Sequence, residues 1–102
     1  MFTLLYVTHP DEQTAKALSQ RLLEEKLVAC ANIFPIQSAY WWEGAVQSEG
    51  EWVSILKTTL EAHPRVEQRL LEIHPYDTPC IIKIELSANA AYEQWIRESV
   101  NA

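Results

Sequence analysis

The feature that most limits the possible folds is a pair of long strand-like stretches on either side of Glu43-Gly44. Residues 27–42 read LVACANIFPIQSAYWW, and residues 45–60 read AVQSEGEWVSILKTTL. The dipeptide between them marks a turn, so the two stretches predict a hairpin. Each arm exceeds the usual strand length of about 5 to 6 residues, and the hairpin is expected to project beyond its own domain. Because a two-stranded arm is marginal alone, we expect it to pair with another surface.

Two residues interrupt the strand pattern inside the hairpin. Pro35 has no N–H to donate to a ladder, so it predicts either a bulge or a position at the edge of the sheet. Gly50 indicates a bulge in the second arm.

Two further strands and three helices are expected around the hairpin. Pro10 suits the first turn of a helix, and the acidic Asp11 and Glu12 suit its positive end. Pro64 opens a second helix in the same way. The expected elements are strand 2–8, helix 9–27, strands 27–42 and 45–60, helix 63–73, strand 80–86 and helix 89–100.

This element order, β-α-β-β-α-β-α, predicts an α+β fold. Two right-handed βαβ crossovers joined by a hairpin give a split βαβ, a four-stranded antiparallel sheet with helices on one face. The length of 102 residues suits a single domain spanning 1–102. The other face of the sheet would expose apolar residues, and we expect the C-terminal helix and partner subunits to cover it.

Composition limits the classes of partner. The net charge is −6, from 14 acidic and 8 basic residues without a basic cluster, so no nucleic-acid partner is expected. No apolar run approaches the ~18 residues of a membrane span. The start MFTLLYVTHPDE lacks a positive n-region and a cleavage site, and we expect a cytoplasmic protein with Cys30 and Cys80 reduced.

The sequence carries no local signature of an enzyme. Its two glycines, Gly44 and Gly50, cannot build a glycine-rich phosphate loop. The motifs H-E-x-x-H, C-x-x-C and G-x-S-x-G do not occur, and no nucleophile and base are ordered into a pair. We therefore expect no catalytic residues and no enzymatic activity.

The stretch EIHPYDTPCII places two candidate metal ligands, His74 and Cys80, in one short loop. Imidazole with a thiolate would favour copper or zinc. The structural alternative is that Pro75 ends the helix and His74 caps it, while strand alternation groups Cys80 with Ile82 and Ile84 on an apolar face, toward the core. Both alternatives stay open.

Lys57 is the candidate for binding an anion. It shares a strand face with apolar residues, so it must snorkel, pair with a carboxylate, or bind an anion. Glu51 lies on the same face, and Tyr92 of the last helix is another possible neighbour. Lys57, Glu51 and Tyr92 therefore form either an internal ion-pair cluster or a site for a small anionic ligand.

The aromatic run Tyr40, Trp41 and Trp42 ends the first hairpin arm. Tyr40 and Trp42 face one side of the strand and Trp41 faces the other. Aromatic residues on a projecting arm favour an oligomer contact over a ligand platform, so we expect these three at an interface between subunits.

Several motifs, taken together, resemble the CutA family of divalent-cation tolerance proteins. They are Ala-Cys-x-Asn-x-x-Pro at 29–35, Trp-Glu-Gly at 42–44, Leu-Lys-Thr at 56–58 and His-Pro-Tyr at 74–76, in this order. The resemblance covers nearly the whole chain, without a large insertion.

The resemblance implies a single CutA-like domain with a ferredoxin-like fold. It also implies a homotrimer in which the long hairpins join sheets across subunits, and a role in tolerance of copper and other divalent metals, with metal binding and no catalysis. The architecture is similar to that of the trimeric PII signalling proteins, which bind small molecules in clefts between subunits. A PII-like module for a small anionic ligand and a purely structural trimeric scaffold are the alternatives.

The chain departs from the family at the expected metal ligands. The family commonly has Glu where this chain has Cys80, and some copper-binding relatives have His and Cys where this chain has Ile73 and Val7. We therefore expect copper or another divalent cation to be held weakly, by His74 and Cys80 with groups from a neighbouring subunit.

Overall fold

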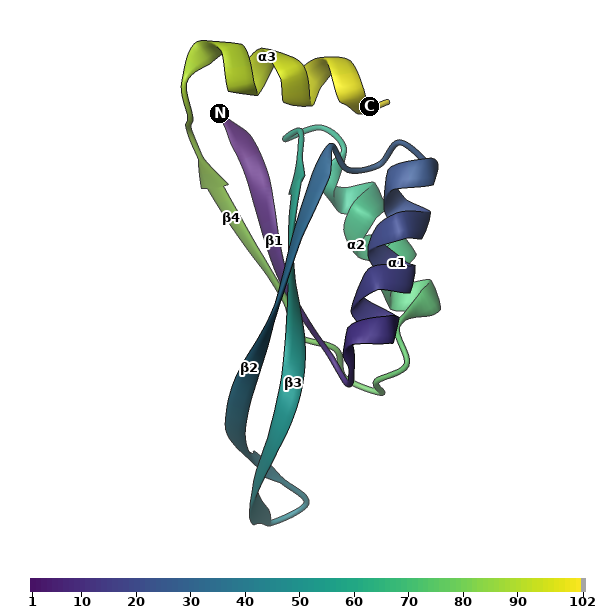
Figure 1. The fold of residues 1–102 in the computed structure, drawn as a ribbon, viewed down its shortest axis with the longest axis vertical. Helices are drawn as coiled ribbons and strands as arrows, with labels where there is room; N and C mark the ends of the chain where they lie inside the picture. Colours follow the sequence, from purple (N-terminus) through teal and green to yellow (C-terminus); the bar gives the residue numbers. More distant parts are fainter. Residues whose placement is uncertain (102) are drawn as a thin grey trace.

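The computed structural model describes residues 1–101, so the last residue of the predicted 1–102 domain lies outside it. The chain forms a four-stranded antiparallel sheet in the order β2-β3-β1-β4, which confirms the predicted split βαβ fold (Figure 1). The elements are β1 Phe2–His9, α1 Glu12–Glu24, β2 Cys30–Trp42, β3 Ala45–Thr58, α2 His63–Ile73, β4 Ile81–Leu86 and α3 Ala90–Ser99.

The first helix is shorter than the predicted 9–27 because both of its ends are fixed by local structure. Asp11 is the N-cap, and its side chain accepts a hydrogen bond of 2.7 Å from the backbone N–H of Thr14. At the other end Lys26 adopts a positive φ of 58°, which stops the helix. Leu27 and Val28 are buried in the connection that follows, so β2 begins at Cys30 and not at residue 27.

The hairpin is regular along its whole length. β2 and β3 pair in one unbroken register from Cys30 opposite Lys57 to Trp42 opposite Ala45, so the bulge predicted at Gly50 is wrong. Pro35 occupies a regular place in β2, which is an edge strand, and needs no bulge there. β1 pairs with β3 only over residues 52–58, and the outer part of the hairpin therefore projects as a two-stranded arm (Figure 1).

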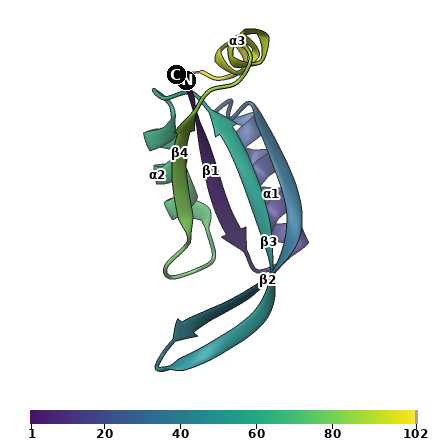
Figure 2. The same ribbon diagram turned by 90° about the vertical axis from the view of Figure 1, so that its left-hand side faces the viewer.

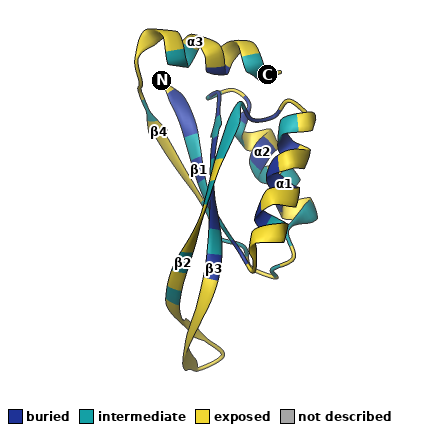
Figure 3. Cartoon of the chain, viewed as in Figure 1, coloured by how far each residue is buried: buried dark blue, intermediate teal, exposed yellow. Residues whose placement is uncertain are grey.

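The hydrophobic core lies between the sheet and the first two helices. Apolar residues of β1, β3, α1 and α2 meet there, as the buried segments in Figure 3 show. A second, smaller cluster lies beneath α3, which crosses one end of the sheet. The two clusters are formed by Leu5, Val7, Leu22, Leu27, Val28, Leu56, Val66 and Leu70, and by Phe2, Ala62, Ile96 and Val100.

The opposite face of the sheet is largely open. Figure 2 shows α1 and α2 behind the sheet and α3 across one end of it. Ile82 and Ile84 are each 47 % exposed on this face, and Phe34 of β2 lies on the same side. The predicted exposed apolar face is therefore present in the single chain. Within residues 1–101, no helix is both long enough and apolar enough to span a membrane.

The hairpin turn depends on Gly44, whose φ is +78°. We predict that Gly44→Ala lowers the free energy of unfolding by about 1 kcal/mol, since a Cβ is strained at positive φ. Gly50→Ala is the matched control: φ is not positive there, and a Cβ would meet Gln37 only at an ordinary contact distance of 3.8 Å. Chemical denaturation of both variants checks this, and equal effects of the two would contradict the turn assignment.

Candidate functional site

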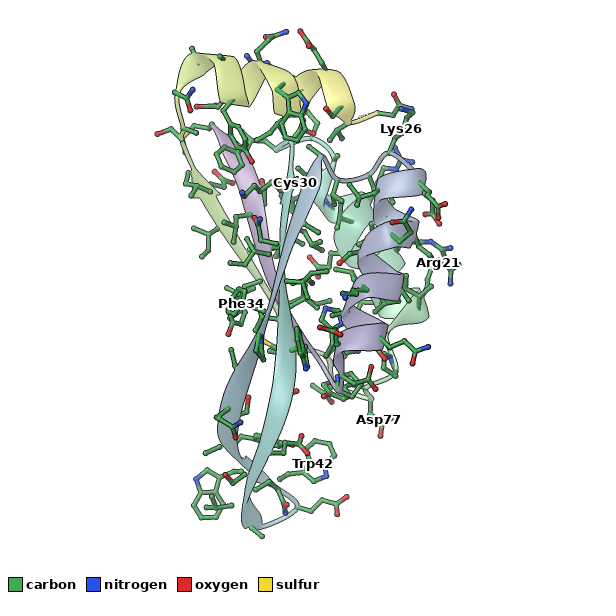
Figure 4. The ribbon with its side chains drawn as sticks, viewed as in Figure 1. Arg21, Lys26, Cys30, Phe34, Trp42 and Asp77 are labelled. Atoms are coloured by element: carbon green, nitrogen blue, oxygen red, sulfur yellow. The ribbon has the colours of Figure 1, made fainter. Side chains whose placement is uncertain are left out.

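A cavity of about 850 Å³ lies where the hairpin leaves the sheet. The outer half of the hairpin bends beneath the loop that joins α2 to β4 (Figure 2), and Figure 4 shows Trp42 on that arm and Asp77 on the loop. β1 and β3 supply the inner wall. The lining includes four aromatic residues, Tyr6, Tyr40, Trp42 and Tyr76, three carboxylates, Glu49, Glu51 and Asp77, and the thiol of Cys80.

His74 anchors the loop at the cavity. Its Nε2–H donates to the backbone oxygen of Thr8 at 2.7 Å, and its Nδ1 accepts the backbone N–H of Tyr76 at 3.1 Å. The backbone N–H of His74 also closes α2 by donating to Leu70 O at 2.8 Å. Burial lowers the pKa of His74, which keeps the ring neutral. Since both ring nitrogens are occupied, His74 can bind a metal only by giving up one of these hydrogen bonds.

His9 lies behind the loop, stacked on His74 with ring centroids 5.3 Å apart. It is only 1 % exposed, and its Nε2 is 2.8 Å from Ser54 Oγ, while Nδ1 has no hydrogen-bond partner among residues 1–101. Burial, together with the neighbouring His74, lowers the pKa of His9 to about 4. The folded chain therefore keeps His9 uncharged at neutral pH.

Glu51 is the buried carboxylate of the cavity. Glu51 is only 7 % exposed, and its Oε2 accepts a hydrogen bond of 2.7 Å from the hydroxyl of Tyr76. It forms no ion pair with any group of residues 1–101. Burial and this hydrogen bond raise the pKa of Tyr76, so the phenol stays protonated and acts as a donor.

Cys80 lies in the cavity and not in the core. It is half-buried and precedes β4, and the prediction that alternation turns it toward the core is wrong. Strand alternation does place Cys80 on the same face as Ile82, but this is the open face of the sheet. Ile81, on the opposite face, packs against the core. Burial and the nearby Glu51 raise the pKa of Cys80, so its thiol resists deprotonation.

The predicted cluster of Lys57, Glu51 and Tyr92 is separated along β3, because Glu51 lies in the middle of the strand and Lys57 lies near its C-terminal end. Lys57 Nζ donates to the hydroxyl of Tyr92 at 3.1 Å, and the same hydroxyl is 3.5 Å from Cys30 Sγ. Figure 4 shows Cys30 beneath α3. The hydrogen bond to Tyr92 is the main cause that raises the pKa of Lys57. Glu51 is six residues away along the strand and bonds to Tyr76 instead.

The aromatic run lies on the outer hairpin and presents two different surfaces. Tyr40 and Trp42 line the cavity, and the hydroxyl of Tyr40 donates to Glu49, which raises the pKa of Tyr40 to about 12. Trp41 points to the other side of the strand and is 75 % exposed. The expected oligomer contact of these three residues stays a prediction.

No preformed metal site occurs in the described part of the chain. Among residues 1–101, no three or more His, Cys, Asp or Glu side chains converge as a metal site requires. Any metal bound near Cys80 would therefore need ligands from a second chain or a movement of the loop.

Sequence reasoning missed the pairing of Glu51 with Tyr76. Tyr76 belongs to the His-Pro-Tyr motif, which was the available signal, but its partner is 25 residues earlier in the chain. Only the return of the loop over the outer hairpin brings the two side chains together.

The shifted pKa of His9 predicts a dependence of stability on pH. Unfolded His9 takes up a proton near its ordinary pKa of 6.5, whereas folded His9 does so only near 4. The contribution of neutral His9 to the free energy of unfolding is therefore complete above pH 6.5, and it is lost as the pH falls from 6.5 toward 4. Between pH 7 and about pH 4.5 we expect a loss of about 2 to 3 kcal/mol from this residue.

His9→Gln removes the titrating group and retains a side chain that can hydrogen-bond to Ser54. The fall in the free energy of unfolding between neutral and acidic pH, measured by urea denaturation, is expected to be smaller by about 2 to 3 kcal/mol in the variant. The same pH dependence in both proteins would show that His9 is not buried in its neutral form.

A family model described as the CutA1 divalent ion tolerance protein matches residues 3–99. The divalent-cation tolerance protein CutA of Thermotoga maritima is 41 % identical over 98 residues, which cover 95 % of this chain and 97 % of the relative.

Solved structures agree with this match. The structure of the periplasmic divalent cation tolerance protein CutA from Archaeoglobus fulgidus superimposes with a TM-score of 0.95 at 39 % identity, covering 99 % of this chain and 100 % of that one. The divalent ion tolerance protein CutA1 from Ehrlichia chaffeensis gives a TM-score of 0.94 at 42 % identity, covering 99 % of this chain and 96 % of that one. The likeness extends over the hairpin and the loop as well as the core.

Proposed function

The chain belongs to the CutA1 divalent ion tolerance family, and we propose that it acts in divalent-cation tolerance as a homotrimeric, non-catalytic metal-binding protein. The observation that carries metal binding is that Glu51 and Cys80 line one cavity, where Glu51 has no cationic partner among residues 1–101. A buried carboxylate without a counter-charge favours a cation beside it.

The proposed trimer follows from what a single chain leaves exposed. The open sheet face carries Ile82 and Ile84, and the outer hairpin has no further strand beside it in this chain. Copies that pair along the hairpins would bury this apolar surface, which is the usual driving force for a permanent assembly. Trp41, exposed on the arm, is well placed to take part in such a contact.

The proposed metal is copper or another divalent cation, bound weakly. The thiolate of Cys80 supplies a soft ligand and the carboxylate of Glu51 a hard one. His74 can add its Nδ1 only when the hydrogen bond from Tyr76 is broken, and the remaining ligands come from a neighbouring subunit. We place the protein in the cytoplasm, where reducing conditions keep Cys80 available as a thiol.

Metal binding by Cys80 should strengthen with pH. Because burial raises the pKa of this thiol and a metal binds the thiolate, we expect the affinity for the redox-inert Zn²⁺ to rise from about pH 6 to about pH 8.5. Cys80→Ser should weaken binding at least about tenfold and reduce this pH dependence. Competition titrations with a chromogenic chelator, on protein kept reduced, measure both effects.

Cys30→Ser is the matched control, because Cys30 lies at the other end of the sheet beside Tyr92. It should retain the wild-type affinity. If Cys80→Ser binds as tightly as the wild type, or if Cys30→Ser loses as much affinity, Cys80 is not a ligand.

A second candidate function is a PII-like module that binds a small anionic ligand between subunits. It is favoured by Lys57, a half-buried ammonium that bonds to Tyr92 and forms no ion pair within residues 1–101. A desolvated ammonium without a carboxylate attracts an anion.

Lys57→Ala tests the second candidate with inorganic phosphate as the probe. Calorimetry should show phosphate binding that the variant loses and that Lys83→Ala, whose ammonium is paired with Glu67, retains. If the wild type does not bind phosphate and the Lys57→Ala variant no longer forms a trimer, Lys57 has a structural role at the subunit interface instead.

A further inference from the structure

We propose that hydrogen peroxide joins Cys30 and Lys57 in a reversible covalent cross-link, a sulfenamide between the thiol sulfur and the amine nitrogen. Both side chains contact Tyr92 of α3, and Figure 4 shows Cys30 beneath that helix. The proposal goes beyond divalent-cation tolerance and is independent of the metal site, because it uses neither Cys80 nor Glu51. Its product would remove the positive charge of Lys57 for as long as the cross-link lasts.

The first argument is the position of the two side chains. Cys30 and Lys57 are directly opposite each other in the ladder of β2 and β3, and such a pair has its Cβ atoms about 4.5 to 5.5 Å apart on one face of the sheet. The hydroxyl of Tyr92 is 3.5 Å from Cys30 Sγ and 3.1 Å from Lys57 Nζ. Sulfur and nitrogen therefore share one neighbour, and rotation of the long lysine side chain can bring them together.

These contacts are made within one chain. Cys30, Lys57 and Tyr92 all belong to it, so their arrangement does not depend on which surface of a neighbouring copy covers the rest of the sheet face. Hydrogen peroxide is little larger than water and needs no open cavity to reach the sulfur.

The second argument is the charge of Lys57. Its ammonium forms no ion pair within residues 1–101, so no carboxylate competes for it there. The hydrogen bond to Tyr92 is the main cause that raises the pKa of Lys57, and the neighbouring Cys30 adds to the rise. A cation beside a thiol favours the thiolate, which is the form that attacks peroxide.

The other thiol has the opposite surroundings. Burial and the nearby Glu51 raise the pKa of Cys80, which slows its reaction with peroxide. None of the described residues that line the cavity around Cys80 is a lysine, so a sulfenic acid formed there has no amine beside it. The cross-link is therefore specific to Cys30.

The reaction consumes one peroxide and balances within the pair. The thiolate of Cys30 attacks a peroxide oxygen, the O–O bond breaks, and the departing hydroxide takes a proton from the ammonium of Lys57. A sulfenic acid then lies beside a neutral amine. The amine nitrogen attacks the sulfur, the S–O bond breaks, and the second hydroxide takes a proton from the nitrogen. The sulfur loses two electrons, the peroxide becomes two waters, and a thiol reductant can restore the thiol and the amine.

Peptide mapping tests the proposal. The reduced oligomer is treated with hydrogen peroxide in the presence of EDTA, free thiols are alkylated, and the protein is digested with trypsin. We expect loss of cleavage after Lys57 and a peptide 27–65 that is about 2 Da lighter than its sequence. Further digestion after Glu43 and Glu51 should leave the fragment with Cys30 joined to the fragment with Lys57, and dithiothreitol should separate them.

Variants separate the cross-link from simple oxidation. Lys57→Arg retains the cation but has no nucleophilic amine, so oxidation of Cys30 should stop at the sulfenic acid, which dimedone labels. The joined peptide should be absent from this variant and from Cys30→Ser. Cys80→Ser and Lys83→Arg are the matched controls, and both should give the wild-type yield of cross-link. The wild-type digest remains decisive if a variant fails to fold.

Three results would overturn the proposal. One is a Cys30 that is still alkylated after peroxide treatment while Cys80 is oxidised. Another is an oxidised Cys30 in protein that trypsin still cleaves after Lys57. The third is an equal yield of cross-link in protein unfolded in urea, which would show that the folded arrangement does not bring the two groups together.

Discussion

The ladder between β2 and β3 is the interaction on which the rest of this structure depends. All 13 residues of β2 take part in it, whereas β1 reaches only the inner half of β3. The same ladder therefore builds one edge of the sheet and a two-stranded arm that continues beyond it. The arm forms the outer wall of the cavity and leaves unpaired edges that further copies of the chain can use.

The position where four strands become two also explains the chemistry of the site. Glu51 stands one residue beyond the last pairing of β1 with β3, so no strand of the sheet covers it on that side. The loop after α2, held by His74 on the backbone of Thr8, supplies the cover and brings Tyr76 to the carboxylate. Near the C-terminal end of β3, Lys57 meets Tyr92 of α3. One strand thus carries a buried carboxylate in its middle and a half-buried ammonium six residues further on.

Much of the fold could be predicted from local patterns. The order of the elements, the turn at Glu43-Gly44 and the helix over 63–73 all follow from residues close together in the sequence. The bulge at Gly50 was predicted wrongly, because glycine permits a distortion without requiring one, and the register is regular there.

The candidate site was less predictable, since its residues are brought together by tertiary structure. Strand alternation correctly separates the two faces of β4, but it cannot say which face the helices cover. Ile82 and Ile84 made the face of Cys80 resemble a core, although in the single chain it is open. The partnership of Glu51 with Tyr76 and the separation of Glu51 from Lys57 both depend on where the arm bends and the loop returns.

We expect copies of the chain to complete the open sheet face and the projecting arm. Native mass spectrometry of the reduced protein measures this most directly. We expect a dominant species with three times the 11.7 kDa mass of the chain. A protein that remains at 11.7 kDa at micromolar concentration, with its hairpin intact, would contradict it.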